Sequence, residues 1–299
     1  VSGGLLAADT LADGGLVSGI GRAGSASANL VLAGGGLQYT GGTASTNRGF
    51  TLGAGNGTVD VANVATTLTV SGTAVGAGRL FKAGSGTLIL SGTNSYTGGN
   101  TVNAGILRAG SGQAFGLASG SMTLANTAAV LLDLNGFNNA VGPLSGGGVS
   151  GGNVTLGSAT LTVNGGGGNY SGVISGAGGV TRTGGGTQTF NGCNNIYTGP
   201  TSLQGAALSV DCLANGGVAS GIGPSGSAST NLVLNNGGLN YTGSTVTIDR
   251  GFQLAGGTST IGVTDASTTL EFTGQVIGGG SLNKRGAGTL VLSGLVKGT

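Results

Sequence analysis

The sequence of 299 residues contains no histidine and no tryptophan, and only 6% of its residues are charged. Without histidine, the side chain that most often serves as a general base and as a metal ligand is missing. The eight acidic residues are scattered along the chain, so no pair of carboxylates is placed for acid–base catalysis. We therefore expect no enzymatic activity, no metal site and no other cofactor.

Strong charge and long apolar runs are absent as well. The net charge of +2 is too small and too dispersed for nucleic-acid binding, which depends on clustered cationic side chains. No stretch of 18 apolar residues occurs, which argues against a membrane-spanning helix. The chain does not open with the features of a signal peptide, so we expect any such leader to have been removed or to lie outside this piece.

Glycine, in contrast, supplies 71 residues, and hydrophobic residues reach 38%. Glycine at this level without a period would indicate disorder, but disordered chains are poor in hydrophobic residues and rich in charge. The presence of only three prolines leaves backbone N–H groups free for a continuous hydrogen-bond ladder. The composition therefore favours an ordered, strand-rich chain.

The chain repeats itself at two periods. Residues 9–92 align with residues 211–294 without a gap, and 46 of these 84 positions are identical. A more diverged stretch lies between them, so we divide the chain into three units of about 100 residues: 1–104, 105–204 and 205–299. Within the first unit, strand-like apolar peaks end at Leu32, Leu52, Val70 and Leu90, in steps of 18 to 20 residues.

This short, gap-free pitch predicts the architecture. A sandwich of hairpins would also give many short strands, but it would not need a constant spacing. A parallel β-helix does need one, because each coil stacks on the previous coil and any insertion must leave as a loop. We therefore predict an all-β, parallel β-helical solenoid with about 18–20 residues per coil over residues 1–299, without α-helices.

One landmark occurs in all three units. It is "GSGTLILSGTNSYTGGNTVNAGIL" at residues 84–107, a diverged copy near residue 184, and "GAGTLVLSG" at residues 286–294. The stretch resembles the autotransporter-associated β-strand repeat, also called the passenger-associated transport repeat. The positions that carry the resemblance are Gly84, Gly86, Thr87, Leu88, Leu90, Ser91, Gly92, Asn94, Tyr96, Thr97, Gly98, Val102, Gly105 and Leu107. The second copy departs from the pattern at Gln188 and Phe190, which stand where the family has inward leucines, and it carries one extra residue before Tyr197.

The resemblance implies a right-handed parallel β-helix that is part of the passenger of a type V secreted protein. It places the chain at the cell surface of a Gram-negative bacterium or outside the cell, where the repeats assist export and the passenger often acts as an adhesin. The expected partners are a host-cell or matrix surface or a glycan, and an outer-membrane β-barrel translocator outside this chain. The two cysteines, Cys193 and Cys212, are 19 residues apart, which is one predicted coil, and an exported protein meets an oxidising compartment. They are therefore predicted to form a coil-to-coil disulfide or, alternatively, to stack as two buried thiols.

Other readings of the function stay open. A subunit or segment of a self-assembling extracellular fibre or sheath would use uncapped coil ends for end-to-end self-association. A β-helical enzyme acting on polysaccharides would need acids from outside this chain, because the nearest candidate, Asp249 and Arg250 with Asp265, has Asn47, Arg48 and Asn63 as its earlier copy.

Two further sets of side chains invite a binding role. A basic residue precedes each landmark, namely Lys82, Arg182 and Lys284. These residues form either a sparse cationic row for anionic glycans or, as we prefer, charged coil corners that keep the protein soluble. The five tyrosines could stack on sugars, but we prefer rings packed at coil corners with their hydroxyls in water.

Overall fold

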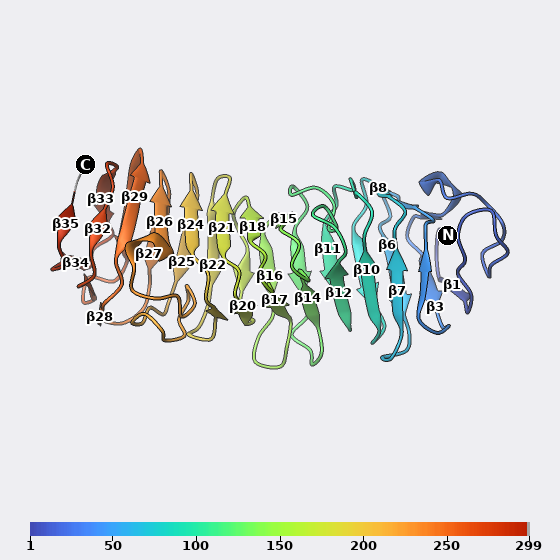
Figure 1. The fold of residues 1–299 in the computed structure, drawn as a ribbon, viewed down its shortest axis with the longest axis horizontal. Helices are drawn as coiled ribbons and strands as arrows, with labels where there is room; N and C mark the ends of the chain where they lie inside the picture. Colours follow the sequence, from blue (N-terminus) through green and yellow to red (C-terminus); the bar gives the residue numbers. More distant parts are fainter. Residues whose placement is uncertain (298–299) are drawn as a thin grey trace. The chain divides into compact units, whose positions relative to one another are not determined.

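The computed structural model describes residues 1–297 and divides the chain into two compact units, Val1–Thr155 and the residues from Leu156 onward. In each unit, short parallel strands stack into sheets, and the chain passes from one sheet to the next as it winds around the coil (Figure 1). The described helices are two short 3₁₀ turns, η1 (Ser27–Asn29) and η2 (Ser229–Asn231). The prediction of an all-β parallel solenoid is confirmed.

Three sheets wrap the core of the first unit. The β1 sheet runs in the order β1 (Leu5–Ala8), β3 (Gly36–Tyr39), β6 (Gly57–Val61), β9 (Leu80–Ala83), β11 (Asn100–Val102), β13 (Met122–Leu124) and β16 (Leu144–Gly146). The β4 sheet contains β4 (Ala44–Thr46), β7 (Thr67–Val70), β10 (Thr87–Leu90), β12 (Ile106–Ala109), β14 (Leu131–Asp133) and β17 (Asn153–Thr155). The short β2 sheet contains β2 (Val31–Leu32), β5 (Phe50–Leu52) and β8 (Ala74–Gly76), and β15 spans Asn139–Val141.

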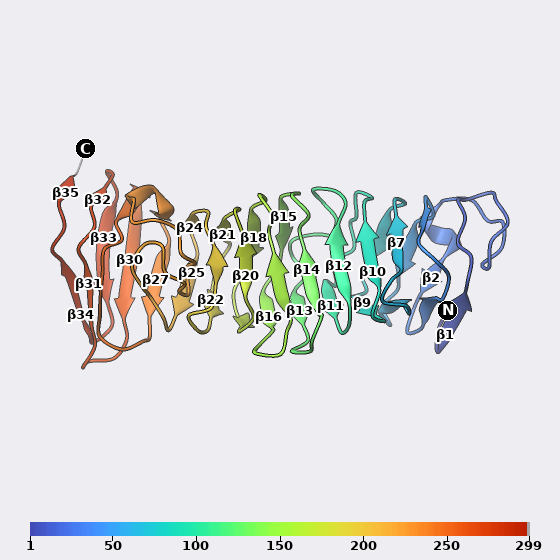
Figure 2. The same cartoon turned by 60° about the horizontal axis from the view of Figure 1, so that its bottom comes forward.

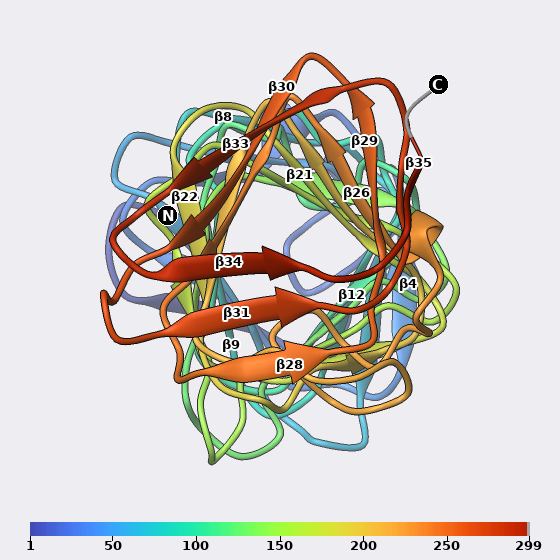
Figure 3. The ribbon, with the colours of Figure 1, turned by 90° about the vertical axis from the view of Figure 1, so that its left-hand side faces the viewer.

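The second unit is built in the same way, and Figure 2 shows several of its strands side by side. The β19 sheet contains β19 (Asn169–Tyr170), β22 (Thr187–Phe190), β25 (Ala207–Val210), β27 (Gly238–Tyr241), β30 (Thr258–Val263) and β33 (Ser281–Arg285). The β18 sheet contains β18 (Leu161–Asn164), β21 (Val180–Thr183), β24 (Thr201–Gln204), β26 (Leu232–Asn235), β29 (Phe252–Gly256), β32 (Val276–Ile277) and β35 (Val296–Lys297). The remaining strands are β20 (Ile174–Gly176) with β23 (Ile196–Tyr197), and β28 (Val246–Ile248) with β31 (Thr269–Phe272) and β34 (Thr289–Leu292). Seen end-on in Figure 3, the sheets of β33, of β29 and of β34 enclose the core of this unit.

The core consists of columns of inward side chains, one from each coil. On the β4 sheet, Leu68, Leu88, Leu107 and Leu132 are in register on successive strands, and none of them is exposed to solvent. The residues between them along each strand face outward, as the two-residue period of a strand requires. Each leucine in such a column contributes about 2 kcal/mol through burial of its apolar surface. The alternation seen in the sequence is therefore the alternation between core and surface.

The coils are longer than predicted. Thr87 pairs with Ile106, 19 positions later, but Ile106 pairs with Leu131, 25 positions later, and Leu5 pairs with Gly36, 31 positions later. The predicted pitch was too short because it was read from peaks on different sheets, Leu52 being on β5 and Val70 on β7. The strands hold their register while the turns between them vary in length, so the pitch of a coil is set by its corners.

Candidate functional site

The landmark of residues 84–107 forms one corner and one strand of a coil. Leu88 and Leu90 lie on β10 and face the core, with exposed fractions of 0% and 1%. Gly84 opens the turn before β10 with a φ of +70°, and a Cβ there would collide with the carbonyl oxygen of Val61 on the preceding coil. Only glycine satisfies both demands. The remaining landmark positions lie around this strand: Gly86 precedes it, Thr87 begins it, and Ser91, Gly92, Asn94, Tyr96, Thr97 and Gly98 lie in the loop that leads to β11.

Asn94 bonds to the coils on both sides of its own. Its Oδ1 accepts a hydrogen bond from the N–H of Ala74 at 2.7 Å, and its Nδ2 donates to the carbonyl oxygen of Ala114 at 2.7 Å. Ala74 precedes Asn94 by twenty residues and Ala114 follows it by twenty. Asn94 is 1% exposed, so water does not replace either bond and each missing bond would leave a buried polar group unsatisfied. The motif asparagine therefore connects three consecutive coils.

The second copy of the landmark repeats this arrangement. Asn195 accepts a hydrogen bond from the N–H of Ile174 at 2.9 Å and donates to the carbonyl oxygen of Gly221 at 3.1 Å. The extra residue before Tyr197 shifts the copy by one position, and Asn195 still occupies the place of Asn94 relative to the tyrosine. The bridging role could not be predicted from the sequence, which shows an asparagine but not the coils that it contacts.

The tyrosine of the landmark is buried together with its hydroxyl. Tyr96 is not exposed, and its hydroxyl donates to Oδ1 of Asn100 at 2.6 Å, while Nδ2 of Asn100 donates to the carbonyl oxygen of Phe115 at 2.9 Å. The hydroxyl of Tyr197 is hydrogen-bonded to Oγ1 of Thr201 at 2.6 Å. Burial raises the pKa of both tyrosines well above its usual value. The prediction of packed rings is correct, and the prediction of hydroxyls in water is wrong for these two residues.

The basic residue before the first landmark points into the core rather than into solvent. Lys82 is in register between Val59 and Val102 in an otherwise aliphatic column, and it is 0% exposed. Its ammonium group donates to the carbonyl oxygens of Ala83, Gly84 and Ala104 at 2.7, 2.8 and 3.0 Å. Burial lowers the pKa of Lys82 to about 8, and the nearby carboxylate of Asp60 opposes this shift. The charge thus caps the backbone of the glycine turn that opens the landmark.

Arg182 occupies the corresponding inward position in the second unit, between Val163 and Leu203, and is also 0% exposed. Its guanidinium donates to the carbonyl oxygens of Val163 and Thr183, and burial lowers its pKa. Lys284 donates to the carbonyl oxygen of Gly286 in the same way, although it is exposed. Both sequence-based interpretations of Lys82 and Arg182, a cationic row and solubilising corners, are therefore wrong, because these cations satisfy carbonyl groups inside the protein.

Two large loops leave the solenoid, and each is organised by one buried arginine. We call residues 9–29 the first loop and residues 211–231 the second loop. Arg48, which is 5% exposed, donates to the carbonyl oxygens of Ala12, Leu16 and Gly21 of the first loop at 2.9, 3.1 and 2.9 Å. Its guanidinium replaces the hydrogen bonds that these carbonyls would otherwise make to water.

Arg250 does the same for the second loop. It donates to the carbonyl oxygens of Ala214 and Gly223 at 2.7 and 2.6 Å and to Oγ of Ser225 at 3.0 Å. Asp265, in contrast, accepts hydrogen bonds from the N–H and the hydroxyl of Ser267. The structure therefore assigns Arg250 to loop packing, and among residues 1–297 no group of three or more acidic or cysteine side chains is arranged to hold a metal.

Each loop is fastened to the following coil by an aspartate and an asparagine, and the two loops exchange their positions. In the first loop, Oδ1 of Asp13 accepts from the N–H of Asn47, and Oδ1 of Asn47 accepts from the N–H of Gly14, both at 2.8 Å. In the second loop, Asn215 stands at the position of Asp13 and Asp249 at the position of Asn47, with corresponding bonds of 2.9 and 2.7 Å. One carboxylate near each buried arginine is thus retained.

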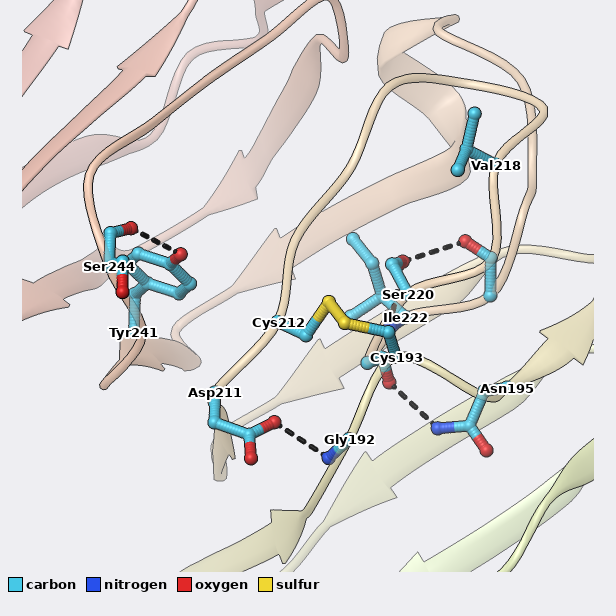
Figure 4. The surroundings of a disulfide bond; sticks show 12 residues. Gly192, Cys193, Asn195, Asp211, Cys212, Val218, Ser220, Ile222, Tyr241 and Ser244 are labelled. Atoms are coloured by element: carbon cyan, nitrogen blue, oxygen red, sulfur yellow. Dashed lines mark hydrogen bonds between the residues drawn. A yellow bond between two sulfur atoms is a disulfide. The ribbon is translucent and has the colours of Figure 1, made fainter.

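Cys193 and Cys212 are joined in a disulfide at the base of the second loop, with Cα atoms 5.3 Å apart (Figure 4). Next to them, Oδ1 of Asp211 accepts a hydrogen bond from the N–H of Gly192 at 2.7 Å. Cys193 is exposed and Cys212 is half-buried, so the bond lies at the surface and not in a core column. The first loop carries Thr10 at the position of Cys212.

The loops also carry exposed aliphatic side chains. Leu16 and Val17 of the first loop are 57% and 73% exposed, and Val218 of the second loop is 52% exposed. All five tyrosines, in contrast, are nearly or completely buried, so none offers a ring face to a sugar. No helix in the described part of the chain is both long and apolar enough to cross a membrane.

Comparison with known proteins agrees with this architecture. The model of the passenger-associated-transport-repeat matches residues 80–109, 180–210 and 282–296, which are the three landmark regions. Over 294 residues the chain is 60% identical to an adhesin, the BmaC autotransporter of Brucella suis biovar 1 (strain 1330). This alignment covers 98% of the chain but only 8% of the relative, so the chain spans a small part of the length of that protein. No solved structure matches the chain. Its three repeats, its parallel solenoid and this relative identify the chain as a passenger segment of the autotransporter type that carries passenger-associated transport repeats.

Proposed function

We propose that the chain is a structural and adhesive segment of an autotransporter passenger, located at the surface of a Gram-negative bacterium or outside the cell. The observation that carries the proposal is the bonding of Asn94 to one coil before it and one coil after it. Each coil that folds outside the cell buries apolar area on the previous coil, as in any one-dimensional solenoid. This gain opposes sliding of the chain back toward the cell, and the repeats thereby assist export.

The adhesive part of the proposal rests on the relative and on the surface. The relative is named an adhesin, and the two loops of this chain hold aliphatic side chains in water. We infer that the segment presents a binding surface to a host-cell surface, to matrix or to a glycan, that it has no enzymatic role, and that an outer-membrane translocator lies elsewhere in the protein.

Surface display tests the folding role. We predict that replacing the inward pair, Leu88→Asp with Leu90→Asp, lowers display of the passenger at least tenfold, because each buried leucine contributes about 2 kcal/mol and an unpaired buried carboxylate costs more than that. Thr93→Asp with Ser95→Asp is the matched control, since both positions belong to the same landmark and are exposed. Display is measured by antibody labelling of intact cells and normalised to total passenger. Unchanged display of the inward variant would exclude stepwise folding as the driving contribution.

Electron microscopy of the native material tests the alternative of a fibre or sheath. Separate particles, or particles tethered to outer membrane, support the passenger function. Continuous filaments with a regular repeat would replace it with end-to-end self-association.

A further inference from the structure

A polar groove of about 400 Å³ lies within the second unit, on the outer face of the β19 sheet. Its floor is made by Gly186, Gly205, Ala207 and Gly238, and the side chains around it are Thr187, Asn236, Asn240, Thr258, Thr260 and Arg285. The rim therefore offers hydroxyls, carboxamides and one guanidinium, and it contains no carboxylate and no aromatic ring. A concave site with several convergent polar groups is the usual form of a small-ligand site.

The polar side chains of this groove are not engaged by the protein. Within residues 1–297, no hydrogen bond or ion pair involves the guanidinium of Arg285, the carboxamides of Asn236 and Asn240, or the hydroxyls of the three groove threonines. Elsewhere in the second unit, polar side chains such as Asn195 and Arg250 are hydrogen-bonded to backbone. Donors and acceptors that converge on one groove and lack internal partners are available to a ligand.

The groove exists because of one small side chain. Ala207, Gly238 and Thr260 are in register on adjacent strands, and a Cβ added to Gly238 would meet Ala207 and Thr260 at 3.7 Å, an ordinary contact. The first unit has Leu5 at the position of Ala207, and there Cδ2 of Leu5 lies 2.7 Å from where a Cβ of Gly36 would stand. Leucine thus fills in the first unit the space that alanine leaves open in the second.

The two faces also differ in charge. Asn240 pairs across the sheet with Gly262, and Gly262 pairs with Arg285. The matching positions of the first unit are Gln38, Asp60 and Ala83, and Nε2 of Gln38 donates to Oδ2 of Asp60 at 3.1 Å. The face of the first unit therefore carries a carboxylate that is already hydrogen-bonded to a neighbour, whereas the face of the second unit carries an unengaged cation.

We propose that the groove of the second unit binds an acidic polysaccharide, with a carboxylate or sulfate of the sugar on Arg285 and its hydroxyls on Asn236, Asn240 and the groove threonines. A guanidinium binds planar or tetrahedral oxyanions through two parallel N–H donors, and carboxamides match vicinal hydroxyls as both donors and acceptors. A neutral glycan would leave Arg285 unused. This inference rests on the proposed adhesive function and names its ligand class.

Binding of defined oligosaccharides to the purified 299-residue chain tests the proposal. The probes are a hyaluronan octasaccharide, which carries carboxylates only, a heparin octasaccharide, which also carries sulfates, and a dextran oligosaccharide as the neutral comparison. We expect at least one acidic probe to bind at physiological salt and dextran not to bind, and the stronger acidic probe identifies the anion that Arg285 prefers. Arg285→Ala, which introduces the residue of the first unit, is expected to lower the affinity at least tenfold.

Two further variants make the test specific. Ala207→Leu fills the groove with the side chain that the first unit accommodates, so it is expected to abolish binding while the thermal unfolding curve is retained. Arg22→Ala removes an exposed arginine of the first loop and should leave the affinity unchanged. Failure of both acidic probes, equal binding of dextran, unchanged affinity after Ala207→Leu, or an equal loss from Arg22→Ala would overturn the proposal.

Attachment of the same preparation to host cells separates this inference from the function on which it rests. If the chain attaches to cells but binds neither acidic probe, the groove proposal is wrong and the adhesive function stands. If the chain binds neither cells nor probes, the adhesive function is wrong as well.

Discussion

The first and second loops solve the same packing problem with different residues. Both leave the solenoid after a strand of the long sheet, both fold back around a buried arginine, and both return through a 3₁₀ turn. The first loop uses Asp13 with Asn47, whereas the second uses Asn215 with Asp249. Only the second loop is tied at its base by the disulfide of Cys193 and Cys212.

The comparison separates what such a loop requires from what has been added to one copy. The arginine is required, because several backbone carbonyls of each loop have it as their donor. A carboxylate near the arginine is retained at either of two positions. The disulfide is an addition, since the first loop folds with Thr10 in place of Cys212. Three predictions follow, from the largest expected effect to the smallest.

Removing the arginines should affect the loops unequally. We predict that Arg48→Met lowers the free energy of unfolding by about 3 kcal/mol, because it leaves several buried carbonyls without a donor. Arg250→Met should cost a similar amount in packing, but the disulfide holds the base of the second loop. Thermolysin should therefore cleave near Leu16 and Val17 in the first variant at least tenfold faster than near Val218 in the second.

Reduction provides the control for this comparison. Non-reducing peptide mapping first establishes that Cys193 and Cys212 are bonded in the exported protein. Adding a reductant to the Arg250→Met variant should then raise its cleavage rate toward that of Arg48→Met. Equal cleavage of the two variants before reduction would show that the disulfide adds nothing to the loop.

Lys82 and Arg182 sharpen the comparison between the repeats, because only lysine can lose its proton in the accessible pH range. The pKa of Lys82 is about 8 in the folded chain, below its ordinary value of 10.5, so the unfolded chain binds more protons between these values. Stability contributed by this site should therefore rise with pH, by about 2 kcal/mol between pH 7 and 9.5. Chemical denaturation at several pH values measures it, and Lys82→Arg, which copies the second unit, should remove this dependence. An identical pH profile for the two proteins would mean that the ammonium group is not buried.

The exchange of aspartate and asparagine can be tested by a double-mutant cycle in the first loop. Asp13→Asn keeps the acceptor of the hydrogen bond to Asn47 but removes the carboxylate near Arg48, and it should cost about 1 kcal/mol. Adding Asn47→Asp reproduces the arrangement of the second loop and should restore most of this loss. A double variant no more stable than Asp13→Asn alone would show that the two positions do not substitute for each other.

The fold could be predicted from the sequence, but most of the site could not. The alternation around Leu88 and Leu90 shows the inward positions, and the gap-free repeat shows the stacking. The roles of Asn94, Lys82 and Arg48 depend on which backbone groups of other coils lie beside them, and these neighbours are 20 to 36 residues away in the sequence. Charge is ordinarily a surface feature, so a lysine next to a glycine turn suggests a solvated corner. The division into units of residues 1–104, 105–204 and 205–299 remains a prediction.

The hydrogen bonds of Asn94 have a consequence for the order of events. One bond reaches a coil earlier in the chain and the other reaches a coil later in the chain, so the side chain is satisfied only when both neighbours are in place. A growing solenoid therefore always carries an incomplete bond at its advancing edge, whichever end folds first. Adding the next coil completes that bond, so every step makes the step before it harder to reverse. The asparagine thus gives the assembly a memory of its own direction, without a motor and without a source of chemical energy.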